Sequence, residues 1–314
     1  MIGVADSVEY RVTHRTAYRY SEPVAICQNQ LRMQPRSRPG LVCHHSELSV
    51  EPAPDSMEAH EDYFGNRVHS FAIESLHRAL TVTVHSHVTV SPGQRVVPPA
   101  MTWEHVVSEV EARAGEAAWQ AFEFRFDSPR VAAGEAFARY ARASFSPGRP
   151  IVQAVADLTA RIHRDFRYDT AATQVHTPTE QAFAMRAGVC QDFAHVGIAC
   201  LRSLGLPARY VSGYLRTVPP PGQPRLVGAD ESHAWLSVYA GEAVGWVDCD
   251  PTNARLTGLD HIPVSVGRDY GDISPMRGVV IGSGSTTLRV SVDVEPVAAD
   301  LSLAPPRPAS RSDD

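Results

Sequence analysis

The sequence predicts an α+β protein in which a β-rich N-terminal domain precedes a mixed domain built on an antiparallel sheet. Residues 8–90 alternate apolar and polar side chains, as in ALTVTVHSHVTV, which is typical of half-buried strands. Residues 151–166 and 190–204 instead repeat apolar side chains at helical spacing. The segments HAWLSVYA and GWVDCDP alternate again, which predicts two strands joined by a tight turn at Gly241–Glu242.

These patterns divide the chain into five segments. Two proline-rich stretches, SPGQRVVPPA and SPGRP, mark the first two boundaries. Alanine-rich helical patterns, roughly 102–122 and 132–145, lie between them. The segments are a β-rich domain (8–98), a helical connector (99–150), a mixed core (151–256), a C-terminal β segment that completes a sheet (257–296), and a tail of disordered composition (297–314).

Composition excludes several classes of protein. A net charge of -6 and a pI near 6.2, with no long run of like charge, argue against binding to nucleic acid. The N-terminus is acidic where a signal peptide is apolar, and no stretch is long enough to span a bilayer, so we expect a cytoplasmic protein without a membrane segment. Five scattered cysteines favour reduced thiols over a disulfide framework.

Cys190 is the candidate nucleophile. It directly precedes a helical pattern that ends at Gly205, which places the thiol in the first turn of a helix. The positive end of the helix dipole favours the thiolate, and the free N–H groups there can stabilise an oxyanion. The alternative is a small buried thiol, the more common role of an unpaired cysteine.

His233 is the candidate base, and Asp250 or Asp248 the residue that orients it. If Gly241 and Glu242 form the turn, the two strands place His233 directly opposite Asp250 on one face. A shift of one residue would favour Asp248 instead.

Three sequence blocks carry a resemblance to a known family. GVCQDFAHVGIACLRSLGLPARYVSGYL, ESHAWLSVY and GWVDCDPTN resemble the core of the transglutaminase-like superfamily, a papain-like group. Segments such as HRTAYRYSEPV and DYFGNRV resemble the β-domain that precedes this core in bacterial members. The resemblance implies a papain-like fold with a catalytic triad of Cys190, His233 and Asp250, and so selects Asp250 over Asp248.

Other residues near these blocks are weaker candidates. Gln191, beside the nucleophile, and Trp235, on the face of His233, are the candidate substrate-binding residues, although core packing is the simpler role for Trp235. The proline-rich stretch 216–231 is either a lid or a stiff surface loop. Histidine pairs in CHH (43–45) and HSH (85–87) lack the spacing of a closed zinc site, so we expect no metal ligands.

The predicted function is cysteine-dependent amide hydrolysis or acyl transfer through a thioester, without metal or cofactor. The expected partner is a peptide or protein substrate, including one that presents a glutamine or asparagine side-chain amide; the oligomeric state is not predicted. Because the chain has no lysine, its copies cannot be joined to each other through lysine side chains. The alternative is a binding module that keeps the groove without catalysis.

Overall fold

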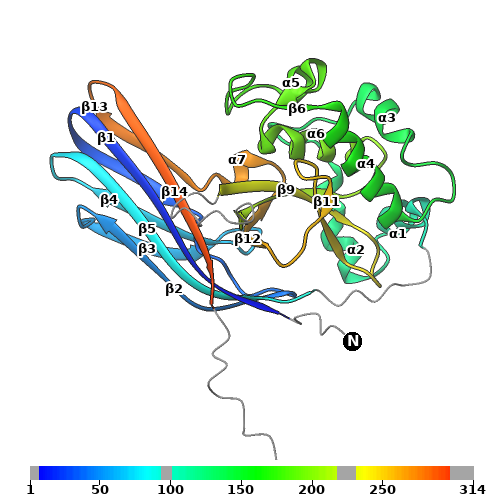
Figure 1. Ribbon diagram of the computed structural model, residues 1–314, viewed down its shortest axis with the longest axis horizontal. Helices are drawn as coiled ribbons and strands as arrows, with labels where there is room; N and C mark the ends of the chain where they lie inside the picture. Colours follow the sequence, from blue (N-terminus) through cyan, green and yellow to red (C-terminus); the bar gives the residue numbers. More distant parts are fainter. Residues whose placement is uncertain (1–6, 93–100, 218–230, 298–314) are drawn as a thin grey trace, which may run out of the picture.

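The computed structural model describes residues 7–92, 101–217 and 231–297, which form a domain of long strands beside a mixed α+β domain (Figure 1). The predicted tail beyond Val297 and residues 218–230, most of the proline-rich stretch predicted as either a lid or a surface loop, lie outside this range. No helix in these described segments is long and apolar enough to cross a bilayer.

The first domain is a seven-stranded sheet to which both ends of the described chain contribute. Its strands are β1 (Val8–Leu31), β2 (Leu41–Glu51), β3 (Ser56–Glu61), β4 (Arg67–Ile73), β5 (His77–Val90), β13 (Met276–Gly282) and β14 (Thr286–Pro296). Of the predicted C-terminal β segment (257–296), only residues 276–296 therefore return to the N-terminal domain, whereas residues 261–273 belong to the second domain.

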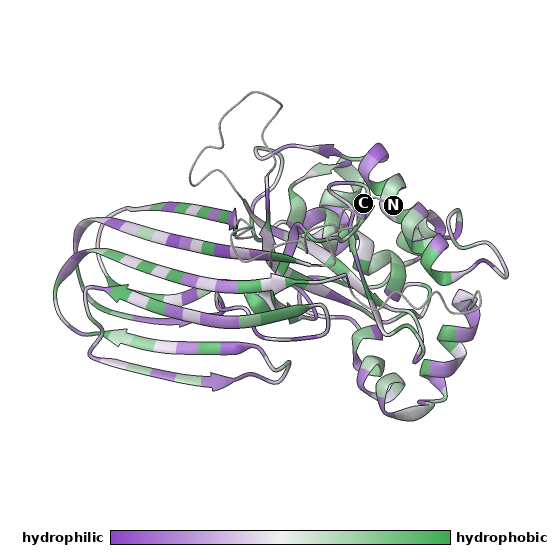
Figure 2. Ribbon diagram, turned by 60° about the horizontal axis from the view of Figure 1, so that its bottom comes forward, coloured by the Kyte–Doolittle hydropathy of each residue, from purple (hydrophilic) through white to green (hydrophobic). Residues whose placement is uncertain are grey.

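Strand β1 organises this sheet. Its first half pairs with β5 and β14, and its second half pairs with β4 and β13. Alternate side chains of β1 are buried from Tyr10 to Thr16, because successive residues of a strand point to opposite faces. The same alternation stripes the long strands in Figure 2.

The second domain combines helices with a five-stranded antiparallel sheet, whose order is β11-β10-β9-β8-β12. The sheet strands are β8 (Ala208–Leu215), β9 (Glu231–Tyr239), β10 (Trp246–Asp250), β11 (Arg255–Leu256) and β12 (His261–Gly267). The α-helices are α1 (Trp103–Glu111), α2 (Gly115–Phe122), α3 (Glu135–Arg142), α4 (Ile151–Asp165), α5 (Thr179–Met185), α6 (Cys190–Arg202) and α7 (Tyr270–Ile273). A 3-10 turn, η1 (Glu123–Arg125), and a two-stranded parallel pair, β6 (Arg167–Tyr168) with β7 (Ala187–Gly188), complete it.

The helices of the predicted connector pack into the core of this second domain. Val106, Ala118 and Phe137 belong to the same apolar cluster as residues of α4 and α6. The first connector helix is not continuous as predicted, because Arg113 (φ 51°) and Gly115 (φ 85°) take left-handed conformations that separate α1 from α2.

Helix α6 lies closely against the sheet. A Cβ added at Gly197 would overlap the end of the Leu236 side chain on β9, so the helix approaches this strand closely here. This contact joins the helix that begins at Cys190 to the strand that carries His233.

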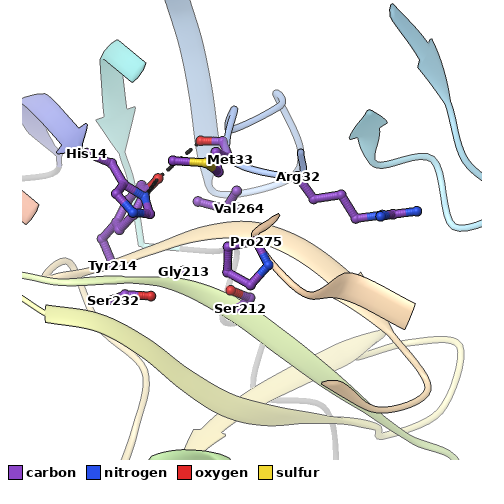
Figure 3. A pocket seen from close by; sticks show the side chains of 9 residues that line it. All are labelled: His14, Arg32, Met33, Ser212, Gly213, Tyr214, Ser232, Val264 and Pro275. Atoms are coloured by element: carbon purple, nitrogen blue, oxygen red, sulfur yellow. Dashed lines mark hydrogen bonds between the residues drawn. The ribbon is translucent and has the colours of Figure 1, made fainter. Parts of the chain in front are cut away.

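The two domains are joined by buried polar contacts. Asn66 bonds the backbone N–H and C=O of Val266 at 2.8 and 2.7 Å, and so pairs with β12 as a strand would. In a small hollow at the interface, His14 Nδ1 lies 2.9 Å from the hydroxyl of Tyr214, which donates to the Met33 carbonyl (Figure 3). The β-domain is therefore packed directly on β8 and β12.

Candidate active site

Cys190 is the first residue of α6, as predicted. The N-cap residue, Val189, is extended, and its N–H donates to the carboxylate of Asp192 at 2.9 Å. The thiol is partly exposed, whereas Cys27, Cys200 and Cys249 are buried. The helix thus presents one accessible sulfur at its positive end.

The carboxylate of Asp192, two residues after Cys190, could disfavour a thiolate by its negative charge, but it is held by other contacts. Besides the Val189 N–H, its carboxylate accepts a 2.6 Å hydrogen bond from Thr173. Burial raises the pKa of Asp192, and these two hydrogen bonds oppose that rise. Gly188 leaves the space for it, because a Cβ there would overlap the carboxylate. Asp192 therefore caps the helix that carries Cys190.

His233 lies on β9 between Cys190 and Asp250. Its Nε2 is 2.9 Å from Oδ2 of Asp250, and its side chain is only 2% exposed. Burial lowers the pKa of His233, but hydrogen bonding with Asp250 and Cys190 and their negative charges outweigh burial and raise the pKa to about 10. Nδ1 is buried without a hydrogen bond of standard geometry, which leaves this nitrogen for the thiol.

The predicted pairing between His233 and Asp250 is wrong by two residues. Asp248 lies opposite Ser237 and Cys249 opposite Leu236, so the register places Asp250 diagonal to His233. The predicted two-residue turn is instead a longer loop, in which the Ala240 N–H donates to the Gly245 carbonyl and the Gly245 N–H donates to the Gly241 carbonyl. Because the error is an even number, both side chains stay on the same face and still meet.

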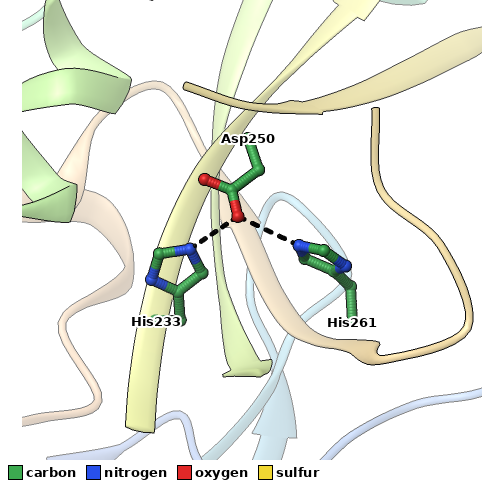
Figure 4. A group of neighbouring side chains, drawn as sticks. All are labelled: His233, Asp250 and His261. Carbon is green, nitrogen blue, oxygen red and sulfur yellow. Dashed lines mark hydrogen bonds and ion pairs between the residues drawn. The ribbon is translucent and has the colours of Figure 1, made fainter. Parts of the chain in front are cut away.

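Asp250 is fully buried and surrounded by donors. Oδ2 accepts from His233, from Nδ2 of Asn253 at 2.7 Å and from Nε2 of His261 at 3.0 Å (Figure 4). Oδ1 accepts the backbone N–H groups of Thr252 and Asn253 at 3.0 and 3.2 Å. Burial raises the pKa of Asp250, but the hydrogen bonds from both histidines outweigh it and hold the pKa well below its usual range.

Asp248, the alternative partner, has other contacts. Its Oδ2 lies 2.7 Å from Arg38 of the β-domain and accepts the Trp235 indole N–H at 3.2 Å. The structure therefore separates the two aspartates: Asp250 meets the imidazole, and Asp248 ties the β-domain to the core sheet.

Comparisons with known proteins identify the family of the chain. Residues 10–89 match the bacterial transglutaminase-like N-terminal region, and residues 138–251 match the transglutaminase-like superfamily. An uncharacterized protein of Mycobacterium tuberculosis, Rv2569c, is 41% identical over 299 residues, 93% of this chain and 94% of that protein. The chain belongs to the transglutaminase-like superfamily.

Two further relatives show different things. A solved protein of Cytophaga hutchinsonii, provisionally named a cysteine protease, has a TM-score of 0.74 over 94% of this chain and 93% of its own, at 21% identity, and so shows a shared fold. The protein-glutamine gamma-glutamyltransferase of Pseudomonas aeruginosa is 31% identical over 124 residues, 33% of this chain and 18% of that protein.

The two candidate substrate-binding residues of this transglutaminase-like protein are buried. Trp235 is 0% exposed and packs edge-on against His261, with ring centroids 5.3 Å apart. Gln191 is 8% exposed, and its amide donates to the Val175 carbonyl at 3.0 Å. Trp235 has no exposed surface and Gln191 very little, which favours the packing role for Trp235 and a loop-holding role for Gln191.

His233, Asp250 and His261 also have the composition of a metal site, since their ligand atoms lie within 4.8 Å of one another. The hydrogen bonds argue against that role. The N–H of Gly258 donates to Nδ1 of His261 at 3.3 Å, so the ring proton of His261 is on Nε2 and faces the carboxylate. A nitrogen that carries this proton has no lone pair for a cation.

Sequence reasoning missed His261. It lies 11 residues after Asp250 at the start of β12, which two strands, β9 and β8, separate from β10 in the sheet. The distance in sequence between His261 and the triad residues follows no known motif. The contact depends on how the sheet brings distant strands together, which the sequence does not show.

Proposed function

We propose that the protein is a cysteine-dependent amide hydrolase or acyl transferase. The observation that carries this proposal is the meeting of three groups: a partly exposed thiol at a helix N-terminus, an imidazole beside it, and a buried carboxylate on that imidazole. Membership of the superfamily supports the general kind of chemistry. The named activity of the Pseudomonas relative supports a glutamine side-chain amide as one substrate class.

The first half-reaction forms a thioester. The Cys190 thiolate attacks the carbonyl carbon of the amide, and N–H groups at the start of α6 stabilise the resulting oxyanion. The protonated His233 donates its Nδ1 proton to the departing nitrogen as the C–N bond breaks. Ammonia leaves from a side-chain amide, or an amine from a peptide bond.

The second half-reaction resolves the thioester. His233, now neutral, takes a proton from water as the oxygen attacks the thioester carbonyl, and the C–S bond breaks to release the acid and the thiolate. An amine in place of water would give transfer instead of hydrolysis. Asp250 holds the ring with Nδ1 toward sulfur in both steps. We favour hydrolysis because it needs no amine-binding site.

Selective alkylation tests the nucleophile. At mildly acidic pH, we expect iodoacetamide to modify Cys190 well before the other four thiols, as followed by mass spectrometry. Cys43 is the internal control because it is also partly exposed, but burial raises the pKa of its thiol. The selectivity should fall in His233→Ala and persist in His105→Ala, which removes an exposed histidine of α1. Equal rates at Cys190 and Cys43 would favour the non-catalytic binding module.

The pH dependence of turnover tests the imidazole. With an amino-blocked glutamine dipeptide as the probe, ammonia release should fall as the pH rises through about 10, because the protonated form of His233 is the acid. Since its pKa is raised on folding, this proton also stabilises the fold fully below pH 6.5, and that contribution is lost through about pH 10. Circular dichroism at each pH separates the two effects. If turnover instead falls near the ordinary histidine pKa, His233 does not form the proposed ion pairs with Asp250 and the Cys190 thiolate.

A further inference from the structure

The carboxylate of Asp250 serves two imidazoles at once. We propose that His261 is a positioning residue of the triad, which holds Asp250 in line with His233 and does not touch substrate. This inference rests on the proposed function, because it assigns a role within that reaction. Its support lies in the contacts of His261 itself.

His261 is fixed in one tautomer and one orientation. Its side chain is 2% exposed, and its Nε2 donates to Oδ2 of Asp250 at 3.0 Å. On the other side of the ring, Nδ1 accepts the Gly258 N–H at 3.3 Å. T-shaped packing against the Trp235 ring, at an interplanar angle of 84°, also holds the imidazole in place. The imidazole therefore presents a fixed donor to the carboxylate.

The contact joins parts of the sheet that are not neighbours. Asp250 ends β10 and His261 begins β12, yet β9 and β8 lie between these strands in the hydrogen-bonded order. The sheet must curve for the two side chains to meet. Figure 4 shows the two histidines on either side of the Asp250 carboxylate, each joined to the same oxygen. The His261–Asp250 hydrogen bond therefore links β12 directly to β10 at the triad.

Both histidines use the same oxygen of Asp250. The His233 ring changes from charged to neutral in each catalytic cycle, so its hold on Oδ2 weakens when the proton leaves. The donor from His261 stays unchanged during the cycle and keeps Oδ2 in place. His233 can then recover the same orientation, with Nδ1 toward Cys190, for the next step.

Substitution of His261 with leucine removes the donor and keeps most of the volume. We expect amide hydrolysis of the blocked glutamine dipeptide to fall about tenfold, the loss typical of one hydrogen bond to a charged group. His261→Gln, whose amide can reach Oδ2, should restore most of the rate. His261→Asn, whose amide is too short to reach, should behave as His261→Leu does and provides a second variant should leucine prevent folding.

The charge on His233 gives a readout that a structural role would not change. Anionic iodoacetate is attracted by the imidazolium and neutral iodoacetamide is not, so the ratio of their rates at Cys190 falls as His233 loses its proton. In the wild-type protein, the midpoint should lie at about pH 10. It should move to lower pH in His261→Leu and His261→Asn, because a displaced carboxylate stabilises the imidazolium less, and it should return in His261→Gln.

His14→Leu is the matched control. His14 is equally buried and also hydrogen-bonded, but it lies at the domain interface beside Tyr214. Its loss should lower thermal stability without moving the midpoint. An unchanged midpoint and rate in the folded His261 variants would overturn the positioning role while leaving the proposed function intact. A wild-type Cys190 without selective alkylation would instead overturn the proposed function, and the positioning role with it.

Discussion

Replacing Asp250 with asparagine is expected to slow hydrolysis of the blocked glutamine dipeptide about 10⁴-fold, the loss seen when the orienting carboxylate of a triad becomes an amide. The amide has no charge with which to stabilise the His233 imidazolium, and its NH2 group opposes the donors that now meet Oδ2. The pKa of His233 should fall from about 10, which moves the alkaline limit of turnover to lower pH.

Asp248→Asn is the matched control for this substitution. The two aspartates lie on the same strand and the same face, but Asp248 contacts Arg38 and Trp235 instead of His233. We expect Asp248→Asn to lower stability through the weakened contact with Arg38 and to leave the alkaline limit unchanged. Steady-state rates across pH, with chemical denaturation of each variant, provide the comparison. A larger loss of turnover in Asp248→Asn would reverse the assignment of the orienting carboxylate.

The sequence predicts those parts of this protein that depend on local patterns. Alternation is enough to assign the long strands of the β-domain, because one face of each must be buried. Helical spacing after Cys190 is enough to place this residue at the start of α6, since the apolar pattern begins directly after it and Gly205 ends the pattern. The order of the three family blocks adds His233 and Asp250.

The hairpin register depends on the conformation of a loop, and composition does not specify that conformation. Gly241 and Gly245 both take positive φ angles, and the Ala240 N–H donates to the Gly245 carbonyl, so residues 241–244 form a four-residue loop where a two-residue turn was predicted. The resulting shift of two residues changes every directly opposed pair of β9 and β10. It preserves the faces, which is why the triad survives an incorrect pairing.

The role of His261 and the burial of Trp235 depend on contacts between distant segments. Trp235 shares a face with His233, but the β-domain covers that face through Arg38 and Phe64. The indole N–H of Trp235 donates a hydrogen bond to Asp248, and no pattern in the sequence predicts that bond. The roles of such side chains can be assigned only when the curvature of the sheet and the packing of the β-domain on it are known.

Gly213→Ala is expected to have the largest effect on stability of any one-carbon change near the site. Gly213 lies opposite His233 on β8, and an added Cβ would overlap both the Ile262 carbonyl oxygen and the ring of Trp235. It would also lie 3.0 Å from Cα of Pro263. Two of these three atoms belong to the backbone of β12, so neither can move aside by a rotation of a side chain. Glycine is typical of strands that another backbone approaches this closely.

We expect Gly213→Ala to lower the free energy of unfolding by about 3 kcal/mol, at the upper end for overpacking, because β12 and Trp235 must both shift. Gly258→Ala adds the same methyl group where no atom lies within 4 Å, so its unfolding midpoint should stay close to that of the wild type. Denaturation with urea measures both. Since β12 carries His261, displacement of this strand should also reduce the alkylation rate at Cys190. A Gly213→Ala protein of wild-type stability would mean that β8 and β12 lie farther apart than this close approach requires.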